Sequence, residues 1–191
     1  PALVNPTEEE FRHFWSTFEG LVSTYYMTPL HSVAAIAGNT PALGAVLSIC
    51  SDYRVMADDD KAKFGLNETS LGMVPPRWLA GMTARTIGER NAELHLGGSS
   101  MLSPREALQC GFLDEVCTRE ELMARAVAAS VKACRIPLGA RSAYKQMVRK
   151  PVADMCGPAS VDEMSACILG AEFQATASAI MEALRQRSKK K

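Results

Sequence analysis

The chain has 191 residues, which is enough for one domain with a hydrophobic core. Its 21 basic residues balance its 21 acidic residues, so no overall field attracts nucleic acid or a membrane surface. Hydrophobic residues make up 47% of the chain, yet no apolar run approaches the roughly 18 residues that span a bilayer. We therefore expect a protein that neither binds nucleic acid nor spans a membrane.

The six cysteines form no metal or redox motif. None belongs to a C-x-x-C pair, and none stands at ligand spacing from His13, His31 or His95. Three adjacent aspartates at 58–60 favour a polar turn, because metal ligands are spaced apart. The sequence therefore predicts free thiols in a reducing compartment and no metal site. The basic run at 189–191 is expected to be a solvated end.

A capping box opens the first expected element. The Thr7 hydroxyl can accept a hydrogen bond from a helix amide, while Glu10 can reach back to the Thr7 backbone. The apolar residues that follow fall on one helical stripe: Phe11, Phe14, Trp15, Phe18, Leu21, Val22 and Tyr25. This pattern predicts an amphipathic helix that ends near Met27. We expect its aromatic residues to belong to the core and His13 to be solvated.

A β-α-β unit follows. Residues 32–37 are short and apolar, which is typical of a strand covered on both faces. We expect Thr40 to cap the next helix and Pro41 to occupy its first position, where a missing amide hydrogen costs nothing. A buried helix over 42–49 and a strand over 52–57 complete the unit. Such alternation predicts an α/β fold with a parallel sheet.

The rest of the chain predicts mostly helices. We expect helices over 78–87 and 91–96, a helix after a capping box at Ser103, a strand over 112–116, a helix from Thr118 to about 134, a helix from Pro137 that stops before Pro151, and one long helix over about 160–187. The strands are too few for a complete sheet. We therefore expect further strands from preceding sequence, since the chain starts at Pro1 rather than Met, or from a partner.

Two features carry candidate chemistry. The turn over 39–44 enters a helix and so offers free backbone amides, which can hold a developing oxyanion. Glu68 stands between Leu66 and Leu71, where burial could raise its pKa and make it a general base. A solvated or capping glutamate and a turn that serves packing alone are the alternatives. Phosphate-binding and serine-nucleophile motifs are absent from the sequence.

Several segments resemble one enzyme family in the same order. They are AAIAGNTPALG (34–44), SDYRVMAD (51–58), GLNETSLGMVPPRWL (65–79), SPREALQCGFLDEV (103–116) and YKQMVRK (144–150). Together they resemble the enoyl-CoA hydratase/isomerase (crotonase) superfamily. The resemblance implies a crotonase-like spiral β-β-α core over 1–116, whose N-terminal part is absent from this chain, and a helical oligomerisation region over 117–191.

The resemblance also assigns site residues. It implies that Glu68 is the catalytic glutamate and that Asn67 lines the site. The amide of Leu43 would form half of an oxyanion hole, with Ala42 and Gly44 beside it letting the substrate approach the backbone. Val46 stands where hydratases of the family carry a second glutamate, so isomerisation is favoured over hydration.

The implied reaction converts 3-enoyl-CoA to trans-2-enoyl-CoA in β-oxidation of unsaturated fatty acids. No cofactor is expected, because the CoA thioester of the substrate is itself the activating group. Lys145 and Lys150 are candidates for the CoA phosphates, with a solvated helix face as the alternative. A homotrimer in the mitochondrial matrix, or in a peroxisome-type organelle, is expected. Enoyl-CoA hydration and a non-catalytic acyl-CoA-binding or scaffold subunit remain as alternative functions.

Overall fold

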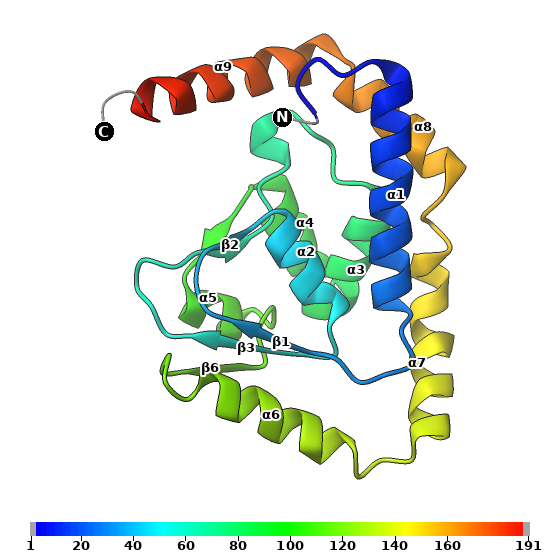
Figure 1. Ribbon diagram of the computed structural model, residues 1–191, viewed down its shortest axis with the longest axis vertical. Coiled ribbons are helices and arrows are strands. Elements are labelled where there is room, and N and C mark those ends of the chain that lie inside the picture. The colour runs from blue at the N-terminus through cyan, green and yellow to red at the C-terminus, as the bar shows by residue number, and fades with distance from the viewer. Residues whose placement is uncertain (1–2, 189–191) are drawn as a thin grey trace.

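The structure is a computed structural model that describes residues 3–188, so the basic run at 189–191 lies outside it (Figure 1). Helices and short strands alternate in the first half, and helices dominate the second. In chain order the elements are α1 (Glu8–Tyr26), β1 (Val33–Ile36), β2 (Thr40–Pro41), α2 (Leu43–Cys50), β3 (Tyr53–Ala57), β4 (Phe64–Gly65), the 3-10 helix η1 (Thr69–Leu71), α3 (Arg77–Ile87), α4 (Glu89–Gly97), β5 (Met101–Leu102), α5 (Pro104–Gln109), β6 (Glu115–Cys117), α6 (Leu122–Ala133), α7 (Leu138–Ala153), α8 (Pro158–Ile168) and α9 (Ala171–Ser188).

Two three-stranded sheets form the β part of the fold. The first has the order β1-β3-β6 and is parallel throughout, with α2 as the crossover between β1 and β3. The predicted β-α-β unit and the α/β class are therefore confirmed. The second sheet has the order β2-β4-β5, with β2 parallel and β5 antiparallel to β4. This second sheet was not predicted from the sequence.

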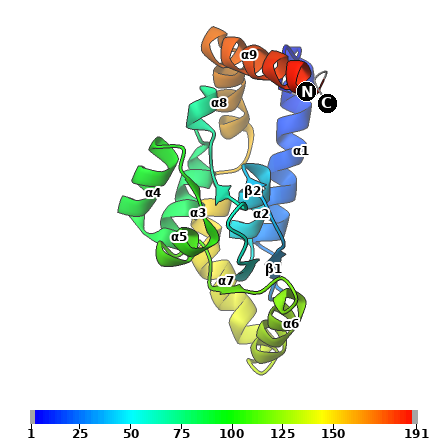
Figure 2. The ribbon, with the colours of Figure 1, turned by 90° about the vertical axis from the view of Figure 1, so that its left-hand side faces the viewer.

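The main core draws its buried side chains from α1, α2, α3 and α8 among other elements. The long α1 packs against α2, α7 and α8, and α6 packs against β1 and β3 (Figures 1 and 2). The large side chains that are fully buried include Trp78, Phe11, Phe64, Phe112 and Met56. The capping box at Thr7 and Glu10 is present, so the predicted start of α1 is confirmed. In Figure 1, α9 extends from the top of the molecule away from α1.

The predicted cap of α2 is wrong. Thr40 and Pro41 form β2, and the helix begins at Leu43 after Ala42. The Thr40 amide donates to the carbonyl of Lys63 (2.7 Å), while its hydroxyl donates to the carbonyl of Gly38. Pairing with β4 therefore extends the chain by two residues before it can turn into the helix.

The predicted end of α7 is also wrong, because the helix passes through Pro151 and ends at Ala153. A proline inside a helix removes one amide donor and crowds the carbonyl four residues before it, so the helix continues only where another interaction offsets that cost. Burial favours the extra turn: Val152 and Ala153 are each 7% exposed, and Val152 packs beside Gly81 of α3. The packing of α7 on α3 thus outweighs the local signal of the proline.

The single long helix expected over 160–187 is two helices. α8 ends at Ile168, which is fully buried, and α9 begins at Ala171. At Gly170 between them, an added Cβ would lie 3.0 Å from the carbonyl oxygen of Cys167. The chain therefore bends where glycine relieves the crowding.

Smaller shifts concern β6 and α6. The strand expected over 112–116 lies at Glu115–Cys117, because Phe112 and Leu113 are buried in the core before it. Thr118 bonds to Glu121 as a cap would, yet regular helix starts only at Leu122. All six cysteines are free, as predicted. Among the residues the structure describes, no helix has the length and apolar character to cross a membrane.

Candidate active site

The second sheet brings two chain segments together at one place. β2 and β4 are parallel neighbours, with Thr40 opposite Phe64 and Pro41 opposite Gly65. Parallel strands end at the same edge of a sheet. β2 leads into the turn at Ala42 and the start of α2, and β4 leads into the loop that carries Glu68. The two candidate features of the sequence therefore emerge side by side.

The turn after β2 has a strained backbone. Ala42 has φ 47° and ψ −115°, a conformation that residues with a Cβ adopt at a cost of about 1–3 kcal/mol. This conformation turns the chain directly into α2, and no side chain caps the start of that helix. Leu43 is the first residue of that helix, so its amide has no acceptor within the helix. No other acceptor for it lies in the described part of the chain. A hydrogen-bond donor is thus available at Leu43.

Glu68 is a buried carboxylate with an unused oxygen. The residue is 5% exposed, and Oε2 finds no hydrogen-bond partner among the described residues. Burial raises the pKa of the Glu68 carboxyl above its ordinary value, against a smaller lowering by its own backbone amide. The Glu68 carbonyl accepts from the amides of Leu71 and Met73, which fixes the start of η1. The unpartnered Oε2 suits a general base that accepts a proton from a bound ligand.

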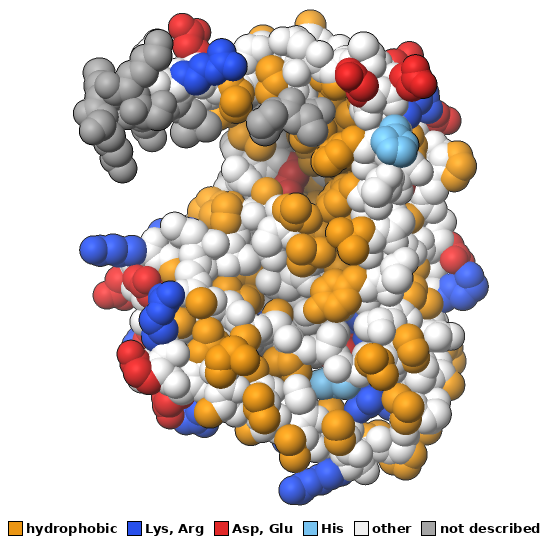
Figure 3. All heavy atoms as spheres, in the orientation of Figure 1, with side chains coloured by type: hydrophobic (Ala, Val, Ile, Leu, Met, Phe, Trp, Pro, Cys, Tyr) orange, Lys and Arg blue, Asp and Glu red, His pale blue; other side chains and the backbone are white. Residues whose placement is uncertain are grey.

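An apolar pocket of about 240 Å³ joins the turn and the glutamate. Its lining residues come from α1, α2, the Glu68 loop, α3 and the segment before α1: Leu3, Phe14, Trp15, Phe18, Ala42, Leu43, Val46, Glu68, Leu71, Met73, Pro76, Trp78 and Leu79. Figure 3 shows apolar side chains gathered in the hollow between α1 and the middle of the molecule, beneath α9. Glu68 is the single charged residue in this lining.

Val46 lies in the wall of the same pocket and is 3% exposed. Among the described residues that line the pocket, no second acid accompanies Glu68, so one carboxylate alone is available for proton transfer there. Gly44 does not line the pocket; an added Cβ at Gly44 would lie 3.0 Å from the Thr40 side chain, so its smallness lets α2 start close to β2.

Asn67 precedes Glu68 but is absent from the pocket lining. Its Oδ1 is buried and, within the described chain, has no partner. The loop is supported from behind by Ser99, whose hydroxyl accepts from the Ser70 amide (2.7 Å) and also bonds the hydroxyl of Thr69. Thr69 donates in turn to the carbonyl of Leu96 in α4. The segment around Glu68 is therefore tied to α4.

The two lysines named for CoA phosphates lie away from this pocket. Lys145 is 6% exposed, and its ammonium bonds the carboxylate of Asp52 (2.7 Å) and the carbonyl of Leu30. Lys150 is exposed and pairs with Asp154, which directly follows the same helix. The structure therefore brings Glu68, Ala42 and Leu43 to the pocket, and neither lysine with them.

The aromatic wall of the pocket was not predicted from the sequence. The aromatic residues of α1 were expected in the core, which holds for Phe11 and Trp15, yet Phe14 is 41% exposed and lines the pocket with Phe18. Trp78 of α3 completes this wall. A stripe of seven apolar residues was a signal, because it is wider than burial against one neighbour requires.

Comparison with known proteins places this chain in a family. The model of the enoyl-CoA hydratase/isomerase family matches residues 3–168, and the chain belongs to that family. Its fold is that of a crotonase-type protein, as the sequence resemblance predicted.

Individual relatives carry isomerase names. The chain is 40% identical over 144 residues to mouse mitochondrial enoyl-CoA delta isomerase 1, a match over 75% of this chain and 50% of that protein. The human protein of that name is 38% identical, over 73% of this chain and 46% of its own length. The crystal structure of human mitochondrial Δ3-Δ2-enoyl-CoA isomerase superimposes with a TM-score of 0.90 at 31% identity, over 97% of this chain and 73% of that chain. The chain thus spans about half the length of the curated relatives it matches.

Proposed function

We propose that this chain carries the catalytic site of an enoyl-CoA isomerase, which moves the double bond of a 3-enoyl-CoA to give trans-2-enoyl-CoA. The observation that carries the proposal is one buried carboxylate, Glu68, in an apolar pocket whose wall includes Val46. Relatives of 37–40% identity named enoyl-CoA delta isomerase support the same reaction.

The reaction needs a proton carrier and an oxyanion hole, of which the amide of Leu43 would form half. The thioester acidifies the hydrogens on C2, and the Glu68 carboxylate takes one of them, breaking the C2–H bond. The electron pair spreads over C2 to C4 and the thioester oxygen as a dienolate. The amide of Leu43 donates to that oxygen, which can lower the barrier by about 3–4 kcal/mol. Glu68 then returns the proton to C4, and the double bond remains between C2 and C3.

Burial of Glu68 serves both halves of this cycle. A carboxylate in an apolar pocket is a stronger base than one in water, and its conjugate acid remains strong enough to protonate C4. The thioester supplies the activation, so no cofactor is required by this mechanism. The same proposal has four further parts. The substrate carries a CoA moiety, and the core spans 1–116. The helices of 117–191 form a homotrimer, and the protein acts in the mitochondrial matrix. Among the candidate phosphate contacts, the exposed ammonium of Lys150 is the accessible one.

Hydration is the second candidate, since the family includes hydratases. It needs a water that is activated by an acid pair, and Val46, which lines the pocket, stands where the family resemblance puts the second acid of hydratases. Acyl-CoA binding without turnover is the third candidate.

One experiment separates the three. Purified protein is given cis-3-dodecenoyl-CoA, and conjugated product is followed by ultraviolet absorbance; it is then given trans-2-dodecenoyl-CoA, and 3-hydroxyacyl product is sought by mass spectrometry. Isomerisation that falls at least about a hundredfold in Glu68→Gln supports the proposal, because a general base contributes that much. Hydroxyacyl product as the main outcome would favour hydration, and binding without either product would favour the scaffold.

A further inference from the structure

A second glutamate, Glu19, lies behind the aromatic wall of the pocket. It occupies the buried face of α1 and is 2% exposed. Its Oε1 accepts from the indole N–H of Trp15 (2.8 Å), from the indole N–H of Trp78 (2.9 Å) and from the hydroxyl of Ser160 (2.6 Å). Its Oε2 accepts from the amide of Gly157 (2.8 Å). Four donors meet one side chain, and only a carboxylate accepts from all of them without offering a proton.

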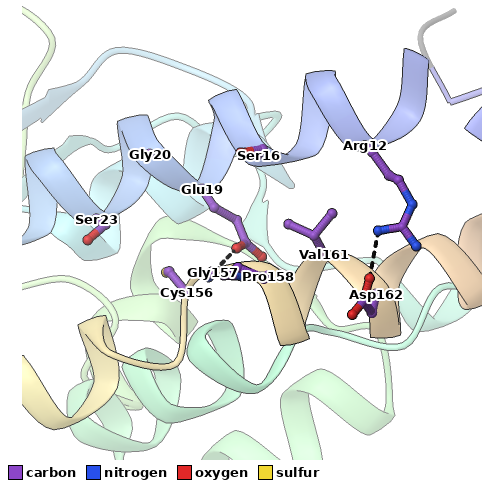
Figure 4. Close-up of a pocket in the computed structure, with 10 residues that line it drawn as sticks. All are labelled: Arg12, Ser16, Glu19, Gly20, Ser23, Cys156, Gly157, Pro158, Val161 and Asp162. Carbon is purple, nitrogen blue, oxygen red and sulfur yellow. Dashed lines mark hydrogen bonds and ion pairs between the residues drawn. The ribbon is translucent and has the colours of Figure 1, made fainter. Parts of the chain in front are cut away.

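No basic side chain pairs with Glu19 among the described residues. Its charge faces the start of α8, which begins directly after Gly157 (Figure 4). The free amides and the dipole at a helix N-terminus stabilise a negative charge. Glu19 thus joins three helices, α1, α3 and α8, at one buried point.

Both tryptophans that Glu19 holds line the pocket of Glu68. Phe18 packs edge-on against each of them, with ring centroids 5.2 Å from Trp15 and 5.9 Å from Trp78, and also lines the pocket. On the side away from the pocket, both indoles of this cluster donate to the Glu19 carboxylate. A second cavity of about 470 Å³ lies between α1 and α8, and Glu19 lines it while neither indole does (Figure 4). Both indoles are buried, so the hydrogen bonds to Glu19 add to their packing by fixing the direction in which each N–H points.

We propose that Glu19 is a positioning residue that fixes the Trp15–Phe18–Trp78 wall and so sets how long an acyl chain the pocket accepts. This inference rests on the proposed function to the extent that the pocket takes an acyl group. Glu19 is remote from the reacting atoms, so its effect passes through the two indoles. Long acyl chains bury more apolar surface against the wall than short ones and therefore depend on it more.

The chain offers a direct probe, because Trp15 and Trp78 are its two tryptophans. Tryptophan fluorescence therefore reports on the wall alone. The non-reacting thioesters dodecanoyl-CoA and hexanoyl-CoA, and CoA itself, are titrated into wild type and Glu19→Gln. Glutamine keeps the shape but presents an amide group to at least one donor. We expect dodecanoyl-CoA binding to weaken roughly tenfold, hexanoyl-CoA binding to weaken less, and CoA binding to stay unchanged. Acrylamide should quench the tryptophan fluorescence of ligand-free Glu19→Gln more strongly than that of ligand-free wild type.

Two further variants keep the test decisive if Glu19→Gln folds poorly. Ser160→Ala removes the donor that α8 supplies to the Glu19 carboxylate. Ser160 does not line the Glu68 pocket. It should weaken dodecanoyl-CoA binding about threefold. The control is Glu163→Gln on the same helix, which breaks an exposed α8–α3 pair with Arg77 and should leave the titrations unchanged.

The outcomes separate this inference from the proposed function. If wild type isomerises 3-enoyl-CoA but Glu19→Gln and Ser160→Ala bind dodecanoyl-CoA as Glu163→Gln does, the role of Glu19 is refuted and the isomerase stands. If wild type turns over nothing but binding depends on Glu19 as expected, the positioning role stands without the isomerase. Wild type that gives no fluorescence response to dodecanoyl-CoA would overturn the inference as well.

Discussion

The amide of Ala42 donates to the carbonyl of Gly65 across 2.9 Å. This bond ties the strained turn before α2 to the last residue of β4, three residues before Glu68. The proposed oxyanion donor at Leu43 and the proposed proton carrier, Glu68, therefore follow segments that one backbone hydrogen bond joins. The distance between them depends on the small β2-β4-β5 sheet rather than on the larger parallel sheet.

Gly65 of β4 has no room for a side chain. An added Cβ would lie 2.1 Å from the carbonyl oxygen of Ser100 and 3.2 Å from the Cα of Met101. Because both obstacles are backbone, we expect Gly65→Ala to lower the free energy of unfolding by about 3 kcal/mol or more. Urea denaturation followed by circular dichroism measures the change.

Gly38→Ala is the matched control, since an added Cβ there meets nothing within 4 Å. It should change the free energy of unfolding by less than about 1 kcal/mol. Equal stability of the two variants would show that β4 and β5 can separate without cost.

Relief of strain is the second prediction. Ala42→Gly removes the Cβ from a residue with φ 47°, which should recover about 1–3 kcal/mol, while the added freedom of the unfolded chain costs about 0.5–1 kcal/mol. We expect a net gain in stability of about 1 kcal/mol. Ala45→Gly, inside α2 and fully buried, should instead lose about 1 kcal/mol or more. A loss in both variants would contradict stored strain at Ala42.

The sequence predicted the parts of this fold that local signals control. The boxes at Thr7 and Ser103 cap their helices because their partners lie three residues away. Thr40 failed as a cap because the carbonyl of Lys63, which is distant in sequence, takes its amide. Pro151 failed as a stop because burial of the following turn against α3 decides the end of α7.

The site, too, has a part that local signals predict and a part that depends on how distant elements pack. Glu68 and the amide of Leu43 follow from the motifs and their resemblance, and the burial of Glu68 agrees with the environment expected for it. The aromatic wall and Glu19 depend on where α1, α3 and α8 meet, which no local pattern encodes. Glu19 did leave one sign, because it lies four residues after Trp15 on the buried face of α1. A charged residue on such a face must have partners.

The third prediction concerns the buried ion pairs at the other end of the molecule. Asp52 bonds Lys145 (2.7 Å) and Arg149 (2.9 Å), and accepts from the amide of Ser32. Burial opposes ionisation of Asp52, yet the Lys145 bond and the Ser32 amide hold its pKa below the usual range. Asp52→Asn leaves two largely buried cations without their carboxylate. We expect it to lose about 3–5 kcal/mol in urea denaturation at neutral pH.

The pH dependence of that loss is fixed by the direction of the shift. The folded pKa of Asp52 lies below the unfolded value, so its contribution is complete above the unfolded pKa and is lost as the pH falls through the folded pKa. The difference between wild type and Asp52→Asn should therefore shrink in acid. Asp154→Asn, which removes an exposed pair with Lys150, is the control and should change stability by less than about 1 kcal/mol at any pH.

The last prediction applies the same linkage, with the opposite sign, to Glu68. Burial raises the pKa of the folded carboxyl above its unfolded value, so the folded protein binds a proton more tightly than the unfolded chain. Stability must then fall as the pH rises from the unfolded pKa through the folded pKa. Glu68→Gln cannot ionise and escapes this loss. We expect the variant to be more stable than wild type at neutral pH and equal to it in acid below both pKa values, as measured by urea denaturation across the pH range.

The same titration should govern activity. Proton abstraction needs the carboxylate, so wild-type kcat/KM should rise with pH around a midpoint above the ordinary pKa of glutamate. Glu68→Gln should then combine the lowest activity with the higher stability, because the charge that abstracts the proton is the charge that the apolar pocket disfavours. A variant that loses both activity and stability at neutral pH would mean that Glu68 is held as an ion by partners, and the apolar pocket would no longer explain its reactivity.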